Sequence, residues 1–358
     1  MAALRKIRVV IVGVGNCASA LVQGTEYYKI RGEDDSVGLT SYSLGGYEPS
    51  DIEFVAAFDV NAKKVGKDIS EAIFEKPNNT IKITDVPRLG VKVQKGRILD
   101  GIGKYLKDVV PVDKVEPTEV SDIISDVQAD IVVNYLPVGS GEATRFYAEQ
   151  AIAAKTAFVN AMPVFIASNE EWEQKFSKAS LPVAGDDVMS QLGATVLHKT
   201  IVKLCVDRGV KVDETYQLNL GGDTDFLNML EESRLVDKRE SKTSAVRAMA
   251  PYEVPTRIGP SDYVKFLDND KICYIYLKGR YFGNIPLTID LKLHVVDAYN
   301  SAGIMIDAIR GTALALERGV SGSLISVSSY CFKHPPQQLP YEEAKRRFIE
   351  FVEGKRER

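Results

Sequence analysis

The sequence predicts an α/β protein in which a doubly wound parallel sheet carries an inserted α+β domain with an antiparallel sheet. Two observations support this class. Short apolar runs alternate with helical stretches up to about residue 185, which is typical of a parallel sheet covered by helices. Residues 285–295 then alternate strictly between apolar and polar side chains, as a strand buried on one face does.

The first half of the chain supplies the expected parallel sheet. Its strand-like runs are short and rich in β-branched and aromatic residues, as buried strands are. A polar, glycine-rich loop is expected over residues 31–50. The strands are expected at 7–12, 54–59, 131–135, 157–160 and 182–185, and the helices at 120–125, 143–154 and 170–179.

The second half is expected to open with a helix that Ser190 caps and Gly209 stops. Strands of the antiparallel sheet follow, and two final helices return to the first domain. The first domain therefore comprises residues 1–195 and 301–358, and residues 196–300 form the inserted domain. The strands are expected at 216–220, 272–278 and 285–295, and the final helices at 301–318 and 342–352.

Composition excludes several classes of function. Of 358 residues, 45% are hydrophobic and 26% charged, and the net charge is −4; a globular protein with this balance has no general affinity for nucleic acid or membranes. The four cysteines lie far apart, which favours a reducing, cytoplasmic setting. No apolar run reaches the roughly 20 residues of a membrane span, and the first residues do not read as a secretory signal.

Residues 13–18, Gly-Val-Gly-Asn-Cys-Ala, follow the first expected strand and open a helical stretch. Gly13 permits a tight turn, Gly15 lets the backbone approach a pyrophosphate, and Ala18 lets helix and strand pack closely. The amides and dipole of the helix N-terminus favour that anion. This position indicates a Rossmann-type dinucleotide-binding domain, although the same pattern also occurs in purely structural turns.

Asp59 ends the next strand, where its carboxylate can accept hydrogen bonds from the adenosine ribose. It lies farther from the glycines than the usual spacing of about 20 residues, which the loop at 31–50 accounts for. Because a carboxylate repels a 2′-phosphate, NAD is preferred over NADP. The nearby Lys63 and Lys64 keep NADP as an alternative.

Lys238 and Lys242 are spaced to lie on one face of a helix. Two like charges there repel each other unless an anion bridges them. The alternative is a solvated basic face, because charged residues also lie between the two lysines. Glycine- and aspartate-rich segments at 185–195 and 221–229 favour a site for a charged, oxygen-rich ligand.

Seven segments in order along the chain resemble the inositol-3-phosphate synthase (myo-inositol-1-phosphate synthase) family, in its shorter prokaryotic branch. The resemblance extends from residue 7 to about residue 340 and is far more specific than any single glycine motif. The segments are 13–19, 134–140, 185–195, 221–229, 241–243, 259–262 and 297–303.

The resemblance implies a redox-neutral isomerisation of glucose 6-phosphate. NAD takes hydride from C5 of the open-chain sugar, and the new ketone acidifies C6. After deprotonation the enolate attacks the C1 aldehyde and closes the ring, and the hydride then returns to C5. Such a reaction needs cations where oxyanions develop and proton carriers at those oxygens. Lysines suit both tasks because burial and cationic neighbours can lower their pKa.

By the matching motifs, the family's catalytic lysines fall on Lys238, Lys242, Lys271 and Lys333. Lys242 and Lys333 are assigned near C1, and Lys238 and Lys271 near C5. The larger eukaryotic relatives place one of these lysines in a differently spaced stretch, and the alternative for Lys271 is a strand-edge lysine in water.

The resemblance also implies the cofactor site. Ser190, Asp225 and Lys238 correspond to residues that approach the dinucleotide in relatives, and Asp68 takes a similar position. The segment after the strand at 131–135 lies where dinucleotides bind in such sheets. The expected cofactor-binding residues are Gly13, Gly15, Asn16, Cys17, Ala18, Asp59, Asp68, Tyr135, Pro137, Ser190, Asp225 and Lys238.

Prokaryotic relatives often use a divalent metal, for which Asp297 is the first candidate ligand and Asp187 or Asp225 the next. Each could equally be a capping or turn aspartate. The histidines lack ligand spacing. The resemblance favours a homotetramer, and an antiparallel sheet with an open face could bury that face against another subunit.

Two other functions fit part of the sequence. A net NAD-dependent dehydrogenase with an inserted domain would share Gly13–Ala18 and Asp59 but not the lysine set. A non-catalytic dinucleotide sensor would bind the cofactor without turnover. The synthase would form inositol phosphate without net NADH, whereas the dehydrogenase would accumulate NADH and the sensor would form no product.

Overall fold

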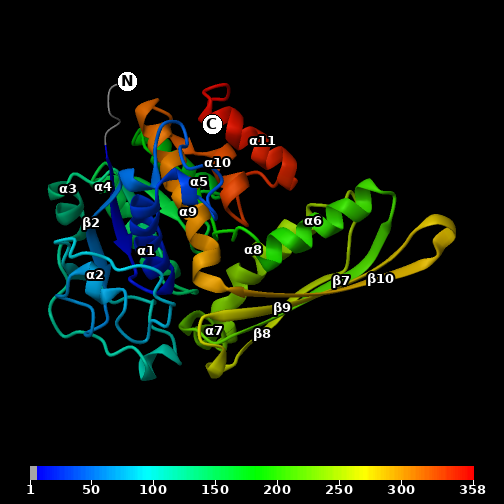
Figure 1. Ribbon diagram of the computed structural model, residues 1–358, viewed down its shortest axis with the longest axis horizontal. Coiled ribbons are helices and arrows are strands. Elements are labelled where there is room, and N and C mark those ends of the chain that lie inside the picture. Colours follow the sequence, from blue (N-terminus) through cyan, green and yellow to red (C-terminus); the bar gives the residue numbers. More distant parts are fainter. Residues whose placement is uncertain (1–5) are drawn as a thin grey trace.

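The computed structural model describes residues 6–358, apart from the side chain of Pro260, which belongs to one of the resemblance segments. Residues 1–5, the start of the expected first domain, lie outside the described residues. A parallel sheet with the order β11-β6-β5-β4-β1-β2-β3 forms the centre of the larger part of the molecule (Figure 1). Its strands are β1 (Ile7–Val12), β2 (Ile52–Asp59), β3 (Val93–Lys95), β4 (Ile131–Asn134), β5 (Ala157–Asn160), β6 (Pro182–Gly185) and β11 (Gly322–Ser323).

The strand order confirms the predicted doubly wound sheet. Connections run in opposite directions on the two sides of β1, so the carboxyl ends of β1 and β4 open the crevice in which such sheets bind nucleotides. The sequence predicts five of the strands. The other two, β3 and β11, contain three and two residues, which is too short for a periodic pattern to show.

Alternate residues of β1 enter two separate cores. Ile7, Val9 and Ile11 face one core, and Val10 and Val12 face the other, because successive side chains of a strand point to opposite faces. The first core is covered by α1 (Asn16–Arg31), α2 (Ile69–Ala72), α9 (Asp297–Glu317), α10 (Ile325–Cys331) and α11 (Tyr341–Val352), and the second by α3 (Val120–Asp126), α4 (Gly141–Ala153) and α5 (Glu170–Lys178).

A second sheet, with the order β10-β9-β7-β8, projects from the first part of the molecule like an arm (Figure 1). The neighbours β10, β9 and β7 are antiparallel, as expected, whereas β8 runs parallel to β7; the sequence did not indicate that pairing. Helices α6 and α8 cover one face of this sheet. The elements are α6 (Ala194–Asp207), β7 (Lys211–Gly221), α7 (Thr224–Met229), α8 (Val236–Arg247), β8 (Thr256–Tyr263), β9 (Asp270–Arg280) and β10 (Pro286–Val296).

The expected cap at Ser190 is wrong. Helix α6 begins at Ala194 with Gly193 at its N-cap and without a side-chain cap. Tertiary backbone bonds hold the segment before it extended: Met189 N donates to Cys331 O and Gln191 N donates to Asn300 O, both at 2.8 Å. These bonds prevent Ser190 from turning into a helix, and they bring it beside the C-terminal part of the chain.

Helix α9 begins at Asp297 rather than at residue 301. Asn269 fixes this start, because its backbone oxygen accepts from Asp297 N (2.9 Å) and its side-chain oxygen accepts from Ala298 N (3.2 Å). The helix therefore carries Asp297 at the point where the two sheets meet, four residues before the expected boundary.

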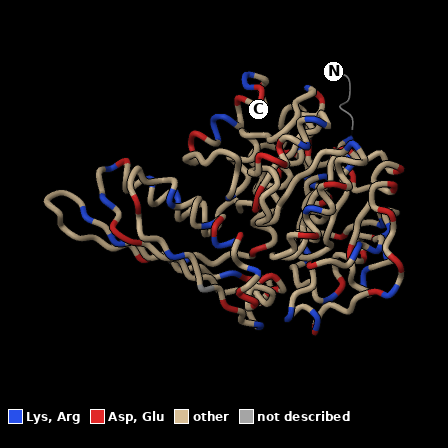
Figure 2. Tube along the Cα trace, turned by 180° about the vertical axis from the view of Figure 1, so that it is seen from behind, with Lys and Arg blue, Asp and Glu red and all other residues tan. Residues whose placement is uncertain are grey.

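Lysines, arginines and acidic residues alternate along the trace, and neither sign covers a whole side of the molecule (Figure 2). This distribution agrees with the small net charge of −4. Among the helices of residues 6–358, none has both the length and the apolar character needed to cross a membrane.

Candidate active site

One pocket extends from the glycine turn after β1 to the four predicted lysines. It joins residues from both sheets, which places the expected cofactor site and the expected chemical site side by side. Two predicted residues are not in its lining: Ala18 packs in the core beneath α1, and Asp68 caps α2 by accepting from Ser70 N (3.0 Å). The predicted residues in the lining are Gly13, Gly15, Asn16, Cys17, Asp59, Tyr135, Pro137, Ser190, Asp225, Lys238, Lys242, Lys271, Asp297 and Lys333.

The glycine turn fits a pyrophosphate. Gly13 has φ of 90°, and a Cβ there would lie 2.6 Å from the carbonyl oxygen of Tyr135, so only glycine is accommodated. A Cβ on Gly15 would meet no atom within 4 Å, because this side of the turn opens into the pocket. No side chain caps α1, and the first amides of the helix remain available to an anion.

Asp59 is held against the glycine turn by backbone amides. One carboxylate oxygen accepts from Val14 N (2.9 Å), and the other accepts from Val60 N and Asn61 N (2.7 and 2.8 Å). Its position at the carboxyl end of β2 is that of a ribose-binding acid.

Lys63 and Lys64, which kept NADP as an alternative cofactor, take different positions. Lys64 is buried and donates to Val14 O (2.6 Å) and Asn78 Oδ1 (2.8 Å), and Lys63 is exposed and is not in the pocket lining. The ammonium of Lys64 is therefore already used in stabilising the turn. Tyr135 contributes a buried hydroxyl with no hydrogen-bond partner in the described part of the chain, which a bound nucleotide could supply.

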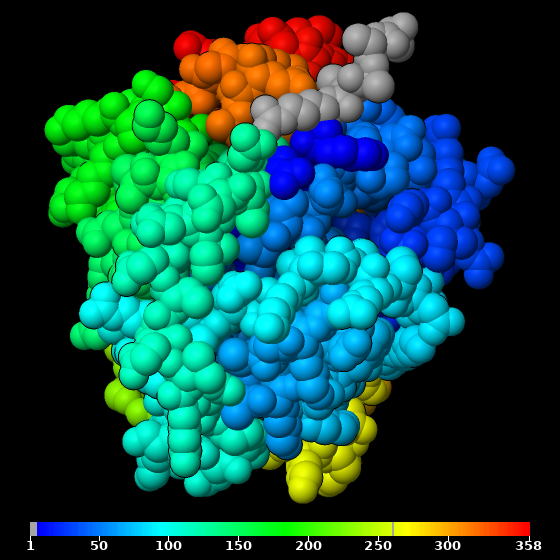
Figure 3. Space-filling model, turned by 90° about the vertical axis from the view of Figure 1, so that its left-hand side faces the viewer, coloured from blue at the N-terminus to red at the C-terminus, as the bar shows by residue number. Residues whose placement is uncertain are grey.

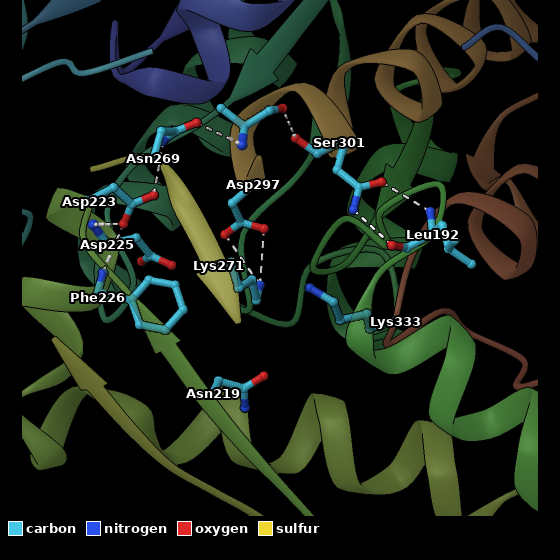
Figure 4. Close-up of polar contacts among 12 residues, drawn as sticks. Leu192, Asn219, Asp223, Asp225, Phe226, Asn269, Lys271, Asp297, Ser301 and Lys333 are labelled. Atoms are coloured by element: carbon cyan, nitrogen blue, oxygen red, sulfur yellow. Dashed lines mark hydrogen bonds and ion pairs between the residues drawn. The ribbon is translucent and has the colours of Figure 1, made fainter. Parts of the chain in front are cut away.

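Three of the four lysines have their own carboxylate. Lys238 donates to Asp225 Oδ2 (2.6 Å), and Lys271 donates to both oxygens of Asp297 (3.1 and 3.2 Å; Figure 4). Burial lowers the pKa of both lysines, but the facing carboxylates outweigh it, so the pKa of each is raised. Both side chains are cations at neutral pH.

The third pair joins the segments that follow β6 and α10, and a hydroxyl of α8 also contacts it. Lys333 donates to Asp187 Oδ1 (2.9 Å), while Ser241 Oγ donates to Asp187 Oδ2 (2.7 Å). Burial opposes the ionised form of Asp187, but Lys333 and Lys238 outweigh it and lower its pKa. Asp187 thereby links Lys333 to α8, the helix that carries Lys238 and Lys242.

Lys242 is different. Its side chain is buried, and no hydrogen bond or ion pair to its ammonium occurs among residues 6–358. Burial is the largest cause that lowers its pKa well below the usual value, followed by the charges of Lys238, Lys271 and Lys333. A lowered pKa favours the neutral amine, which is the form of a lysine that can accept a proton.

Sequence reasoning overlooked Asp223 and Asn269. Asp223 caps α7 by accepting from Asp225 N (2.9 Å) and Phe226 N (3.1 Å), and Asn269 Nδ2 donates to its other oxygen (3.4 Å; Figure 4). Burial and the neighbouring Asp225 and Asp297 raise the pKa of Asp223 to about 7. The Gly-Gly-Asp-Thr-Asp pattern was a usable signal for this cap, whereas nothing local marks Asn269.

The carboxylates do not fit the expected metal site. Both oxygens of Asp297 face Lys271, and Asp187 and Asp225 are each paired with a lysine. Within residues 6–358, no three His, Cys, Asp or Glu side chains form a group that could hold a metal ion. A divalent cation prefers several oxygen ligands, so the cations that this donor set supports are the lysines themselves.

Known proteins resemble the chain over nearly its full length. Residues 193–298 match the family model described as myo-inositol-1-phosphate synthase. The inositol-3-phosphate synthase of Mycolicibacterium smegmatis is 52% identical over 357 residues and covers 98% of both chains. That of Mycobacterium tuberculosis is 51% identical over 353 residues, which is 98% of this chain and 96% of that relative.

Solved structures share the fold. A myo-inositol-1-phosphate synthase-related protein from Thermotoga maritima superposes with a TM-score of 0.84 at 24% identity, covering 98% of this chain and 99% of that one. An inositol-3-phosphate synthase from Caenorhabditis elegans gives 0.76 at 16% identity, covering 97% and 85%. At these identities the likeness concerns the fold alone.

Proposed function

The chain belongs to the myo-inositol-1-phosphate synthase family, and we propose how its pocket carries out that family's reaction. The enzyme converts D-glucose 6-phosphate to 1D-myo-inositol 3-phosphate (1L-myo-inositol 1-phosphate) with NAD. One observation supports the proposal above all: lysines from α8, from β9 and from the segment after α10 meet the dinucleotide turn in a single pocket.

NAD, when bound, accepts hydride from C5 of the sugar and later returns it. The protein must hold the cofactor, stabilise the oxyanions that form at C5 and C1, and move protons at those oxygens. We assign Gly13, Gly15, Asn16 and Asp59 to holding the cofactor, because the open amides and the anchored carboxylate lie on that side of the pocket.

The four lysines divide into two pairs in our proposal. Lys238 and Lys271 lie near C5 and act as cations, which their carboxylate partners Asp225 and Asp297 support. Lys242 and Lys333 lie near C1. Lys242 carries the proton there, since it is buried and forms no ion pair among residues 6–358, while Lys333 is held in place by Asp187.

One incubation tests the function. Purified protein with glucose 6-phosphate and NAD should form inositol phosphate with no net accumulation of NADH. Accumulation of NADH in step with substrate loss would instead indicate a net dehydrogenase, and cofactor binding without product would indicate a sensor. Repeating the assay with a chelator tests the metal: unchanged turnover is the result expected from the lysine-paired carboxylates.

We propose that residues 1–195 with 301–358 hold the cofactor and that residues 196–300 are the catalytic and oligomerisation domain of a homotetramer. Support comes from the sheet face that α6 and α8 leave uncovered: Tyr216 and Tyr274 are each 40% exposed there, and Tyr216 stacks on Tyr276 with ring centroids 5.0 Å apart. Exposed aromatic residues that are contiguous on a sheet suit a subunit interface.

The tetramer is tested by light scattering. Tyr216→Lys with Tyr274→Lys should lower the measured mass, because charges would be placed in the interface, and unchanged mass would refute the assignment.

We also propose a cytoplasmic location, since all four cysteines are free thiols; activity in the cytosolic fraction checks it.

A further inference from the structure

Arg234 joins the wall of the cofactor pocket to the lysine domain. It lies in the short turn between α7 and α8, and its Nε donates to Val138 O (3.0 Å) while Nη2 donates to Asp100 O (2.9 Å). Both carbonyls belong to loops of the first domain. The donors of a guanidinium are fixed in a plane, so bonds to two loops hold those loops in one arrangement.

Neighbouring residues reinforce the same junction. Asn228 Nδ2 also donates to Val138 O (2.8 Å), and Glu231 accepts from Lys104 N (2.6 Å). Glycines allow the close approach: a Cβ at Gly139 would lie 2.6 Å from Arg234 Cβ, and one at Gly103 would lie 2.7 Å from Glu231 Oε2. Two independent loops thus leave space for this one turn.

The loop held by Arg234 is a wall of the pocket. Ile98, Leu99 and Ile102 line the pocket on either side of the carbonyl that Arg234 holds. Asp100 also accepts from Glu142 N (2.7 Å) and Ala143 N (2.9 Å) at the start of α4. The long connection between β2 and α3, light blue to turquoise in Figure 3, lies over much of the lower half of the face shown there.

The other end of the junction is the lysine helix. Arg234 precedes Leu235, the N-cap of α8, and lies four residues before Lys238. Leu235 packs with Val138 and Phe226 in a small buried cluster. A shift of the pocket wall would therefore move the start of the helix that carries two catalytic lysines.

We propose that Arg234 is a positioning residue that keeps the reduced cofactor in the pocket until the hydride is returned, by holding the 97–104 wall against the start of α8. This inference rests on the proposed function, because a redox-neutral reaction fails whenever the reduced cofactor leaves before it has returned the hydride. Arg234 touches neither sugar nor cofactor in this assignment; it acts through the loop.

The test compares Arg234→Gln with Arg234→Lys and with Arg8→Gln as a matched control. Arg8 also donates to a backbone carbonyl, that of Val127 (2.8 Å), but lies outside the pocket lining. Inositol phosphate and free NADH are measured together, NADH affinity is measured by fluorescence titration, and hydrogen exchange is followed in residues 97–110 of the cofactor-free protein.

Arg234→Gln should weaken NADH binding about ten- to a hundredfold, the loss expected for charge-assisted bonds. It should also speed exchange in 97–110 and release NADH as a by-product. Arg234→Lys should lie between it and wild type, and Arg8→Gln should match wild type. Unchanged NADH affinity and exchange in a folded Arg234→Gln variant, whatever its turnover, would overturn the inference.

Gly103→Ala provides a second route that keeps the guanidinium group, because its Cβ would lie 2.7 Å from Glu231 Oε2 and 3.0 Å from Arg234 Cδ and would push this turn away from the wall. If Arg234→Gln does not fold, faster exchange and weaker NADH binding in Gly103→Ala support the inference, and wild-type values refute it. Absence of inositol phosphate from wild type would sink the proposed function instead, and NADH affinity and exchange would still decide the role of Arg234.

Discussion

The two sides of the pocket obtain their electrostatics in different ways. The cofactor side uses backbone amides from one short stretch, residues 13–18, and a carboxylate that the backbone itself holds. The proposed sugar side has four lysines from distant segments: one is buried, and the other three are half-buried and balanced by carboxylates. A fixed dipole needs only a local turn, whereas a tuned ammonium needs neighbours from the whole fold.

The difference is sharpest at Lys242. Replacing it with alanine should lower inositol phosphate formation about 10²–10⁴-fold, the range of general acid–base catalysis, and leave NAD affinity within about twofold of wild type. Steady-state assay and NADH titration measure the two effects. Lys203→Ala is the control, since Lys203 pairs with Asp207 on the surface of α6. A large loss of NADH affinity in Lys242→Ala would contradict the separation of the two sides.

Gly13→Ala should impair the cofactor side of the pocket. Its Cβ would lie 2.6 Å from Tyr135 O, and φ of 90° strains any L side chain. NAD affinity should fall about a hundredfold while the lysines stay in place. Gly24→Ala, in the helix α1 that follows the turn and with no atom within 4 Å of its Cβ, is the matched control. Equal affinities for both variants would refute the role of the turn.

Asp297→Asn tests whether a counter-ion matters to a lysine of the sugar side. Without the carboxylate, burial dominates and the pKa of Lys271 falls. Turnover should drop about tenfold, the cost of a weakened buried ion pair, and NADH affinity should hold. Asp213→Asn, which removes a surface partner of Arg280, should leave turnover at the wild-type level. Wild-type turnover in Asp297→Asn would show that the pair is only structural.

The smallest expected effect is a shift in the pH dependence of kcat/KM. The pKa of Lys242 is lowered, and the amine must be neutral to accept a proton, so kcat/KM should be lost as pH falls through that lowered pKa. Lys333→Met removes one of the cations that depress it. The pKa then rises, and the acid limb should move to higher pH in the activity that remains. A limb that stays in place would assign the titration to another group.

Local pattern predicted much of the fold. The five strand runs, the glycine turn and the face shared by Lys238 and Lys242 were all visible, because hydrophobic period and turn chemistry are properties of adjacent residues. The cap at Ser190 failed for the opposite reason: backbone bonds from Met189 to Cys331 and from Gln191 to Asn300 compete with it. No window of sequence contains both partners.

The sequence by itself determined which chemical groups the site has: the amides of the turn, the acid at the end of β2, and lysines that match a known family. Only the tertiary structure decided their state. The pKa of Lys242 is lowered and that of Lys238 is raised, although they occupy the same helix face. An ammonium responds to burial and to charges a few ångströms away. Those charges come from α7, from β9 and from the segments after β6 and α10, which the chain brings together only by folding.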